Sequence, residues 1–182
     1  MSVDRDQVLR TAAALLTRKA TATMDEVARA SGIGRATLHR HFAGRDALVR
    51  ALEELGIREF EAALDAARTD EGSASDAVRR LVAEIEPAAG LLAFLVTENQ
   101  LFEGEMNEGW DRLDSRVSAV FQRGQRQGEF RIDLSPAWLT DAFYGLVSSG
   151  FWAVHDGRVA TKDFQYMIAE LLLGGARRSV EQ

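Results

Sequence analysis

Apolar residues recur along most of this chain at spacings of three and four residues, the period of an amphipathic helix. Over about residues 4–19 they form a single stripe: Val8, Leu9, Ala12, Leu15 and Leu16. The same period predicts further helices over about 45–67, 74–86, 87–102, 108–128, 136–155 and 161–174. Strand-like alternation is almost absent. With two short helices near residue 30, the pattern predicts an all-α fold of about nine helices.

Residues 23–48 form the most informative stretch. Thr23 and Glu26 make a capping box, so a short helix should begin at Met24. Gly32 and Gly34 then favour a tight turn before a second short helix. That helix should leave its polar side outward: Arg35, Ala36, Thr37, His39, Arg40 and His41. Two helices across such a turn form a helix-turn-helix, whose second helix can enter the major groove of DNA.

The segment VARASGIGRATLHRHFAGRDAL resembles the DNA-binding signature of TetR/AcrR-type transcriptional repressors, and the resemblance covers about residues 8–52. It implies that Thr23 and Thr37 contact DNA phosphates, that Arg35 and Ala36 lie at base edges, and that Arg45 meets the DNA backbone. The sequence departs from the family pattern at three positions. Glycine replaces the small capping residue at Gly34, and histidines replace two tyrosines at His39 and His41, so contacts through a phenol hydroxyl are not implied.

The resemblance also implies a division into two domains. Residues 1–47 would form the three-helix DNA-binding domain, and residues 48–182 a helical ligand-binding and dimerisation domain. The charge distribution agrees with this division. Residues 1–50 contain nine Arg/Lys and five Asp/Glu, a balance of +4, whereas the remainder contains thirteen and twenty-three, a balance of −10. A locally basic segment is sufficient for phosphate binding even in an acidic chain.

The last two predicted helices have apolar faces broader than one helix pair can cover in a small domain. A protomer core is the simplest interpretation. The resemblance implies instead a four-helix bundle formed with a second copy, through Leu139, Phe143, Leu146, Val147, Gly150, Phe151, Ile168, Leu171, Leu172 and Gly175. A two-fold homodimer would present two recognition helices, so double-stranded DNA with a roughly palindromic operator is the expected partner.

An aromatic-rich set with few polar members lies in the second domain. A hydrophobic core explains such a set, and so does a mostly apolar pocket with one or two orienting polar groups. The resemblance implies a small-molecule effector site here. The candidate ligand-binding residues are Phe94, Leu95, Glu98, Phe102, Trp110, Phe121 and Tyr144.

Catalytic and metal sites have little support. The chain lacks cysteine, which removes disulfides, thiolate zinc sites and cysteine nucleophiles. His39 and His41 are two residues apart on a helix and so point to different sides, which makes a poor metal pair. We therefore expect no enzyme activity, no catalytic residues, no metal and no cofactor. The first residues lack the apolar core of a signal peptide, and no apolar run is long enough to span a membrane, so we expect a cytoplasmic protein without a membrane partner.

The combined prediction is a homodimeric, sequence-specific DNA-binding repressor that a small apolar or amphipathic ligand releases from its operator. Two alternatives remain open. One is a DNA-binding dimer without a small-molecule effector. The other is a helical small-molecule-binding protein, a carrier or an enzyme-like body, with a degenerate DNA-binding head.

Overall fold

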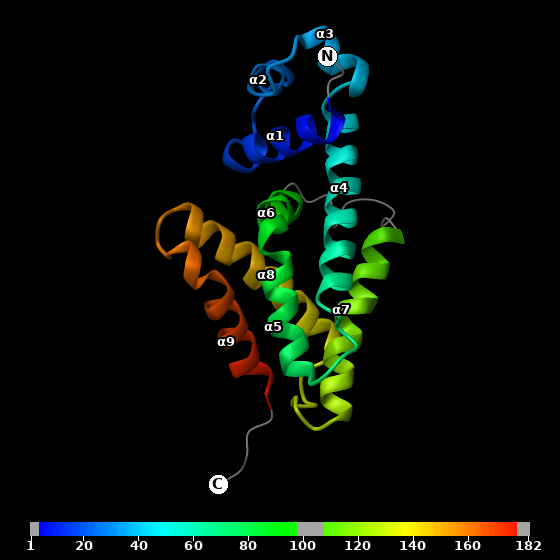
Figure 1. The fold of residues 1–182 in the computed structure, drawn as a ribbon, viewed down its shortest axis with the longest axis vertical. Coiled ribbons are helices and arrows are strands. Elements are labelled where there is room, and N and C mark those ends of the chain that lie inside the picture. Colours follow the sequence, from blue (N-terminus) through cyan, green and yellow to red (C-terminus); the bar gives the residue numbers. More distant parts are fainter. Residues whose placement is uncertain (1–3, 98–107, 178–182) are drawn as a thin grey trace.

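The computed structural model describes residues 4–97 and 108–177, and these residues form nine α-helices and two short 3-10 helices (Figure 1). The α-helices are α1 (Arg5–Arg18), α2 (Met24–Ala30), α3 (Arg35–His41), α4 (Arg45–Ala66), α5 (Ala74–Ile85), α6 (Ala89–Thr97), α7 (Glu108–Arg126), α8 (Pro136–His155) and α9 (Phe164–Ala176). The 3-10 helices are η1 (Glu86–Ala88) and η2 (Thr161–Asp163). Within the described ranges, the β-type pairing consists of one isolated bridge, between Phe130 and Arg177. The predicted all-α fold is confirmed.

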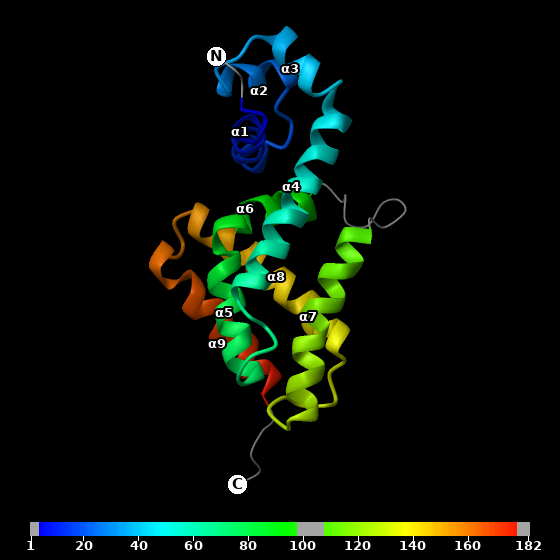
Figure 2. The same ribbon diagram turned by 45° about the vertical axis from the view of Figure 1, so that its right-hand side comes forward.

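The helices divide the molecule along its long axis. A head, α1 to α3, lies at one end, and a body, α5 to α9, forms a bundle at the other. The long helix α4 begins in the head and continues along the body, as Figures 1 and 2 both show. Helix α1 also packs against α6, so the head meets the body through two helices.

The head is held by a small apolar core. Leu9 and Leu16 of α1, Leu38 of α3 and Leu52 of α4 have no exposed surface. Each fully buried leucine contributes about 1.5–3 kcal/mol from its removal from water. Because Leu38 is the buried residue of α3, this one side chain fixes which side of the short helix faces outward.

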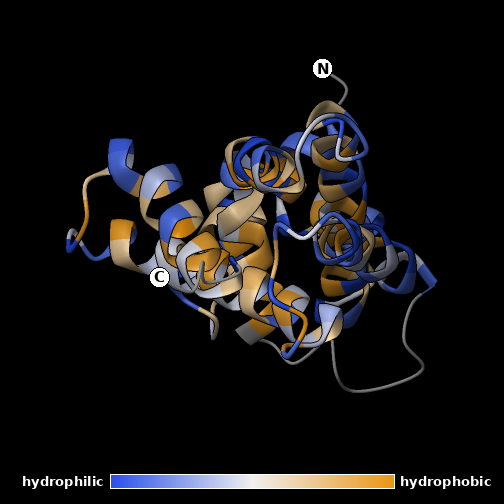
Figure 3. Cartoon of the chain, turned by 90° about the horizontal axis from the view of Figure 1, so that it is seen from below, coloured by the Kyte–Doolittle hydropathy of each residue, from blue (hydrophilic) through white to orange (hydrophobic). Residues whose placement is uncertain are grey.

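The body is built from helices whose apolar sides face one another. Seen along the long axis, hydrophobic residues concentrate on the inner sides of the helices (Figure 3). Phe60 of α4, Phe121 of α7 and Phe143 of α8 are at most 2% exposed. One continuous apolar cluster runs from Val8 to Ala176. Helix α4 therefore contributes to the apolar core of both the head and the body.

Most predicted helix starts are confirmed by their caps. The side chains of Thr23, Ser73 and Ser135 accept hydrogen bonds from the first turns of α2, α5 and α8. Two starts differ from the prediction, since residues 86–88 and 161–163 form 3-10 turns before α6 and α9 begin. These tighter turns are common at helix ends. No helix in the described ranges combines the length and the apolar character needed to cross a bilayer.

Candidate DNA-binding interface and ligand-binding region

The first helix of the helix-turn-helix is fixed by a reciprocal cap. The backbone N–H of Glu26 donates to Thr23 Oγ1 at 3.3 Å, and the backbone N–H of Thr23 donates to Glu26 Oε2 at 2.8 Å. Lys19 Nζ donates to the other oxygen of Glu26 at 2.7 Å. The Lys19 ammonium, and then the Thr23 backbone, lower the pKa of Glu26 to about 2. The hydroxyl of Thr23, a predicted phosphate contact, is therefore already part of this cap.

The turn between the two helices depends on Gly32. Its φ of +66° lies in the left-handed region that favours glycine. Helix α3 then begins after Gly34, whose carbonyl accepts from the backbone N–H groups of Thr37 and Leu38 at 2.9 and 3.0 Å. Gly34 has no side chain to cap the helix, so two backbone bonds and the buried Leu38 position α3.

The outward side of α3 carries the predicted contact residues. Arg35, Ala36, His39 and Arg40 are exposed, and Thr37 and His41 are partly buried. Arg40 Nη2 donates to Thr37 Oγ1 at 3.3 Å. The six predicted residues all belong to α3, and this helix lies at one end of the molecule (Figure 2).

Asp25 adds an acidic group beside this surface that the sequence analysis did not identify. Its Oδ1 lies 3.2 Å from Arg35 Nε, and its Oδ2 accepts from Arg35 Nη1 at 3.4 Å. The side chains of Arg35 and Asp25 are 69% and 53% exposed, so this ion pair is accessible to DNA. Asp25 thereby offers the first side chain of α3 an exposed ion-pair partner in the absence of DNA. Only the crossing of α2 and α3 brings these two residues together, and no local spacing signals it.

Arg45 forms hydrogen bonds within the head in the absence of DNA. Its Nη1 and Nη2 donate to the carbonyls of Ala22 and Ala20 at 3.1 and 2.7 Å. The guanidinium therefore closes the loop between α1 and α2. The structure gives Arg45 a structural role, and its predicted contact with the DNA backbone stays a prediction for the complex.

The predicted ligand-binding residues separate into two groups. Leu95 and Trp110 lie together around a void of about 10 Å³ between α4 and α6, which Phe60 also lines. Tyr144 meets the ring of Phe60 edge-on, with 5.6 Å between centroids. Phe121 instead packs on Phe130, with 5.9 Å between centroids. Phe94 is buried, and Glu98 and Phe102 lie outside the described residues.

Two carboxylates missed by the sequence analysis accompany the first group. Trp110 Nε1 donates to Glu53 Oε1 at 2.9 Å, and the Tyr144 hydroxyl donates to Asp114 Oδ1 at 2.7 Å. Burial raises the pKa of Asp114, opposed by the hydrogen bond from Tyr144. Burial also raises the pKa of Tyr144. The region therefore combines aromatic rings with two acidic groups at its edge.

The predicted dimer residues are distributed over two sides of α8 and α9. Six of them are buried in the protomer's own core: Leu139, Phe143, Val147, Gly150, Ile168 and Leu172. Gly150 lies so close to α9 that an added Cβ would be 2.7 Å from Ile168 Cδ1. These six residues lie in the protomer core, where Phe143 stacks on Phe60 of α4, and their predicted contact with a second copy stays a prediction. Leu146 and Phe151 are partly exposed, and Leu171 and Gly175 are exposed.

The free side of α8 and α9 has its own apolar residues. Trp138, Tyr166 and Leu171 are 59%, 71% and 66% exposed, and the glycines Gly145 and Gly174 are also exposed. A surface of large apolar side chains with small residues between them is suited to close helix packing. Helix α9, which carries Tyr166 and Leu171, lies at one edge of the body (Figure 1).

Comparison with known proteins identifies the head and extends beyond it. Residues 8–52 match the model of the family "Bacterial regulatory proteins, tetR family". The chain is 32% identical over 174 residues to the HTH-type transcriptional regulator NfxB of Pseudomonas aeruginosa, covering 94% of this chain and 93% of that protein. It is 28% identical over 154 residues to the HTH-type transcriptional repressor LfrR of Mycolicibacterium smegmatis, covering 84% and 80%. These relatives are transcriptional regulators rather than enzymes.

The fold comparison agrees over the whole length. The crystal structure of LfrR from Mycobacterium smegmatis in complex with proflavine superposes with a TM-score of 0.79 at 26% identity, covering 98% of this chain and 97% of that one. Head, linking helix and body thus share one arrangement with a solved regulator. From its signature segment, its relatives and its fold, the chain belongs to the tetR family of bacterial transcriptional regulators.

Proposed function

We propose that this regulator is a homodimeric repressor that holds a roughly palindromic operator and leaves it when a small amphipathic ligand binds. The observation that carries the proposal is the outward side of α3, with exposed Arg35 and Arg40 at the free end of a locally basic head. An exposed cationic helix of a helix-turn-helix has the form and charge to enter a major groove.

On DNA, each residue of the head has a proposed role. Arg35 donates to a guanine, which presents two acceptors in the major groove, and Asp25 holds its guanidinium in place. Ala36 lies against a neighbouring base edge. The phosphate contacts come from Thr23, Thr37, His39, Arg40 and His41, with Arg45 supporting the loop behind them.

The second copy would dock on the outer side of α8 and α9, over Trp138, Tyr166 and Leu171. The predicted domain division, 1–47 and 48–182, assigns DNA contact to the head and this contact to the remainder. A two-fold dimer of this kind places two recognition helices on two half-sites, which is why a palindromic operator is expected.

The effector site of the proposed repressor lies between α4, α6, α7 and α8, around Trp110 and Tyr144. The relative LfrR was crystallised with proflavine, a planar aromatic cation. Aromatic rings with the carboxylates of Glu53 and Asp114 at their edge suit such a ligand, through stacking and ion pairing. Because the present void is about 10 Å³, the ligand must separate these helices. Its higher affinity for the separated conformation shifts the protein toward that conformation.

DNA recognition is tested by fluorescence anisotropy with duplex from upstream of the protein's own gene and with scrambled duplex, at two salt concentrations. Wild-type protein should prefer the upstream duplex. Arg35→Ala should weaken that preference by about 5- to 150-fold, since a bidentate base contact contributes about 1–3 kcal/mol. The matched control is Arg126→Ala, which removes the same charge from the far end of α7. Equal effects of the two variants would contradict the proposed interface and favour a degenerate head.

The effector site is tested by adding proflavine to the protein–operator complex. Release is expected, and Glu53→Gln combined with Asp114→Asn should blunt it while operator affinity persists. Asp111→Asn, an exposed acid one turn earlier on α7, is the control. Operator binding that no planar cation reverses would favour a dimer without this class of effector.

A further inference from the structure

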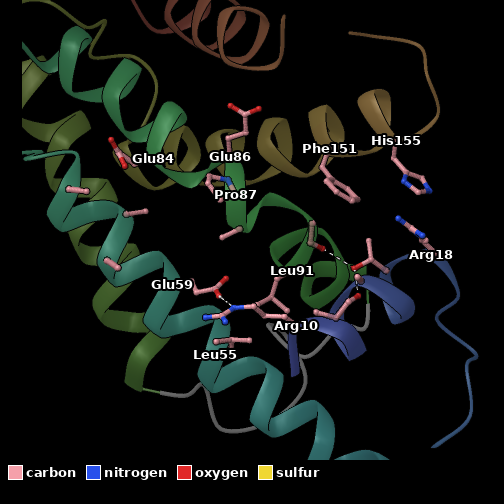
Figure 4. A pocket seen from close by; sticks show the side chains of 18 residues that line it. Arg10, Arg18, Leu55, Glu59, Glu84, Glu86, Pro87, Leu91, Phe151 and His155 are labelled. Atoms are coloured by element: carbon pink, nitrogen blue, oxygen red, sulfur yellow. Dashed lines mark hydrogen bonds and ion pairs between the residues drawn. The ribbon is translucent and has the colours of Figure 1, made fainter. Parts of the chain in front are cut away.

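A second and larger cavity opens where the head meets the body (Figure 4). We name it the seam cleft. It has a volume of about 790 Å³ and lies between α1 on one side and α4, η1, the start of α6 and the end of α8 on the other. None of the residues proposed above for DNA, ligand or dimer contact lines it except Phe151. Its volume falls within the range of about 300–1,000 Å³ that is usual for small-molecule sites.

The cleft exists because short side chains meet along this seam. Ala13 and Ala14 of α1 and Ala62, Ala63 and Ala66 of α4 are among the residues that line it. A methyl group projects little from its helix, so these positions leave space that leucines would narrow. The floor is therefore apolar and open, with Leu55 and Leu91 completing it.

Carboxylates surround one end of the seam cleft. Glu59 of α4 faces Arg10 of α1 across it, with Oε1 and Nε 3.7 Å apart, and Figure 4 shows the two side chains pointing toward each other. Glu84 at the end of α5 adds a second acid, and no interaction of its side chain is found within the described ranges. Arg10 is 56% exposed, so this ion pair is weak and readily exchanged.

Aromatic rings line the other end. Phe151 and His155 of α8 are stacked, with centroids 5.8 Å apart and an interplanar angle of 15°. Phe151 also lies against Gly90 of α6, where an added Cβ would be 2.7 Å from the ring. The carbonyl of Gly90 accepts from Thr17 Oγ1 of α1 at 3.1 Å. The aromatic end of the cleft is thus built on the contact that joins α1 to α6.

We propose that the seam cleft is a second ligand site, which binds a small aromatic organic cation. The ring lies over the alanine floor against Phe151, and the cationic group replaces Arg10 beside Glu59, within reach of Glu84. A cation is preferred for two reasons. The carboxylate of Glu84 has no partner within the described ranges, and the exposed ion pair between Arg10 and Glu59 is weak. Arg18 of α1 lies at the aromatic end, beside His155, so the cationic group is placed at the opposite end, where the carboxylates would repel an anion.

Occupancy of the seam cleft would act on the head directly. The ligand touches α1 and α4 together, so its affinity depends on the angle between head and body. By linkage, it then alters DNA affinity by the same factor by which DNA alters its own. The binding step stands without the proposed function, whereas the effect on DNA rests on it.

The test is equilibrium binding of proflavine to the full-length protein in the absence of DNA, followed by its fluorescence. Glu53→Gln with Asp114→Asn serves as the background, because it disables the site proposed in the body. In that background Ala62→Leu, which places a larger side chain in the wall of the seam cleft, should weaken the remaining binding at least about tenfold. Ala119→Leu, the same change at an exposed alanine of α7, should leave it unaltered. Glu59→Gln should weaken it by a smaller factor, by removing one carboxylate.

Two results would overturn the proposal. One is the absence of saturable proflavine binding in the Glu53→Gln, Asp114→Asn background. The other is binding that Ala62→Leu and Ala119→Leu affect equally. Failure of the protein to bind any duplex would instead count against the proposed repressor. It would not affect the proposed ligand site in the seam cleft, because proflavine binding is measured without DNA.

Discussion

Arg45 offers a direct way to separate architecture from DNA contact in the head. Its guanidinium donates to the carbonyls of Ala20 and Ala22 at 2.7 and 3.1 Å, which ties the start of α4 to the loop before α2. Hydrogen bonds from charged groups contribute about 1.5–3 kcal/mol each. Water can reach this half-buried loop and replaces part of that contribution. We therefore expect Arg45→Ala to lower the free energy of unfolding by about 2 kcal/mol.

The assay is thermal unfolding, in which about 2 kcal/mol corresponds to a decrease of about 4–8 °C in Tm for a chain of this size. Arg45→Lys keeps the charge but loses the planar fork that reaches both carbonyls. It should therefore destabilise the protein by about half as much. The exposed Arg40→Ala is the control, expected within about 0.5 kcal/mol of wild type.

A phosphate contact predicts the opposite pattern. The Tm of Arg45→Ala would match that of wild type, and its operator affinity would fall about tenfold or more. The slope of log affinity against log salt concentration would decrease by about one. Arg45→Lys would retain most of the affinity, because lysine also binds phosphate. That pattern would refute a structural role for Arg45.

Three further predictions concern stability, assembly and pH. Gly124→Ala should cost about 1–3 kcal/mol in the free energy of unfolding by urea, because its methyl group would overlap the Phe130 ring and lie 2.9 Å from a second side chain; unchanged stability would disprove the tight α7 packing. Leu171→Glu should convert dimers to monomers in analytical ultracentrifugation, whereas Ala119→Glu should not; a dimeric Leu171→Glu protein would exclude the outer side of α9. Glu26 has a folded-state pKa of about 2 against an ordinary 4.5, so its stabilising effect is complete above pH 4.5 and is lost as the pH falls through 2; an acid titration of unfolding should show Glu26→Gln losing this dependence, and parallel curves would contradict the cap.

The sequence predicted best those helices whose first residue is set by a cap between residues close in the sequence. Thr23, Ser73 and Ser135 cap α2, α5 and α8 as their positions indicate, since a cap involves residues two or three apart. The order of helices follows from such signals and from the apolar period. The outward side of α3 was also predictable, because Leu38 marks the buried side of a seven-residue helix.

Partners between helices were harder to predict, because they depend on packing. Phe143 and Leu172 are apolar on a helix that is apolar nearly all round, and the period does not reveal whether the protomer or a second copy covers them. The structure buries both in the protomer. The contacts of Asp25 and Glu53 were not predicted for a related reason. Asp25 meets Arg35, and Glu53 meets Trp110, only because the helices that carry them pack together.

The seam cleft illustrates the limit most clearly. In the sequence, the alanines of α1 and α4 are good helix formers and give no other signal. Their effect appears only when two helices meet with methyl groups on both sides. A cavity forms where side chains are small. A search of the sequence for charged, polar or aromatic residues therefore does not identify the alanines that line it.

The two connections between head and body explain why both proposed ligand sites can influence DNA. Helix α4 runs from the head core at Leu52 to Phe60 beside Tyr144, so separating α4 from α7 moves its start. Helix α1 meets the body separately, through the hydrogen bond from Thr17 to Gly90. A ligand in the body displaces one connection relative to the other, whereas a ligand in the seam cleft lies between them. We expect both ligands to change the same angle, and by linkage each would then alter the affinity for the other as well as for DNA.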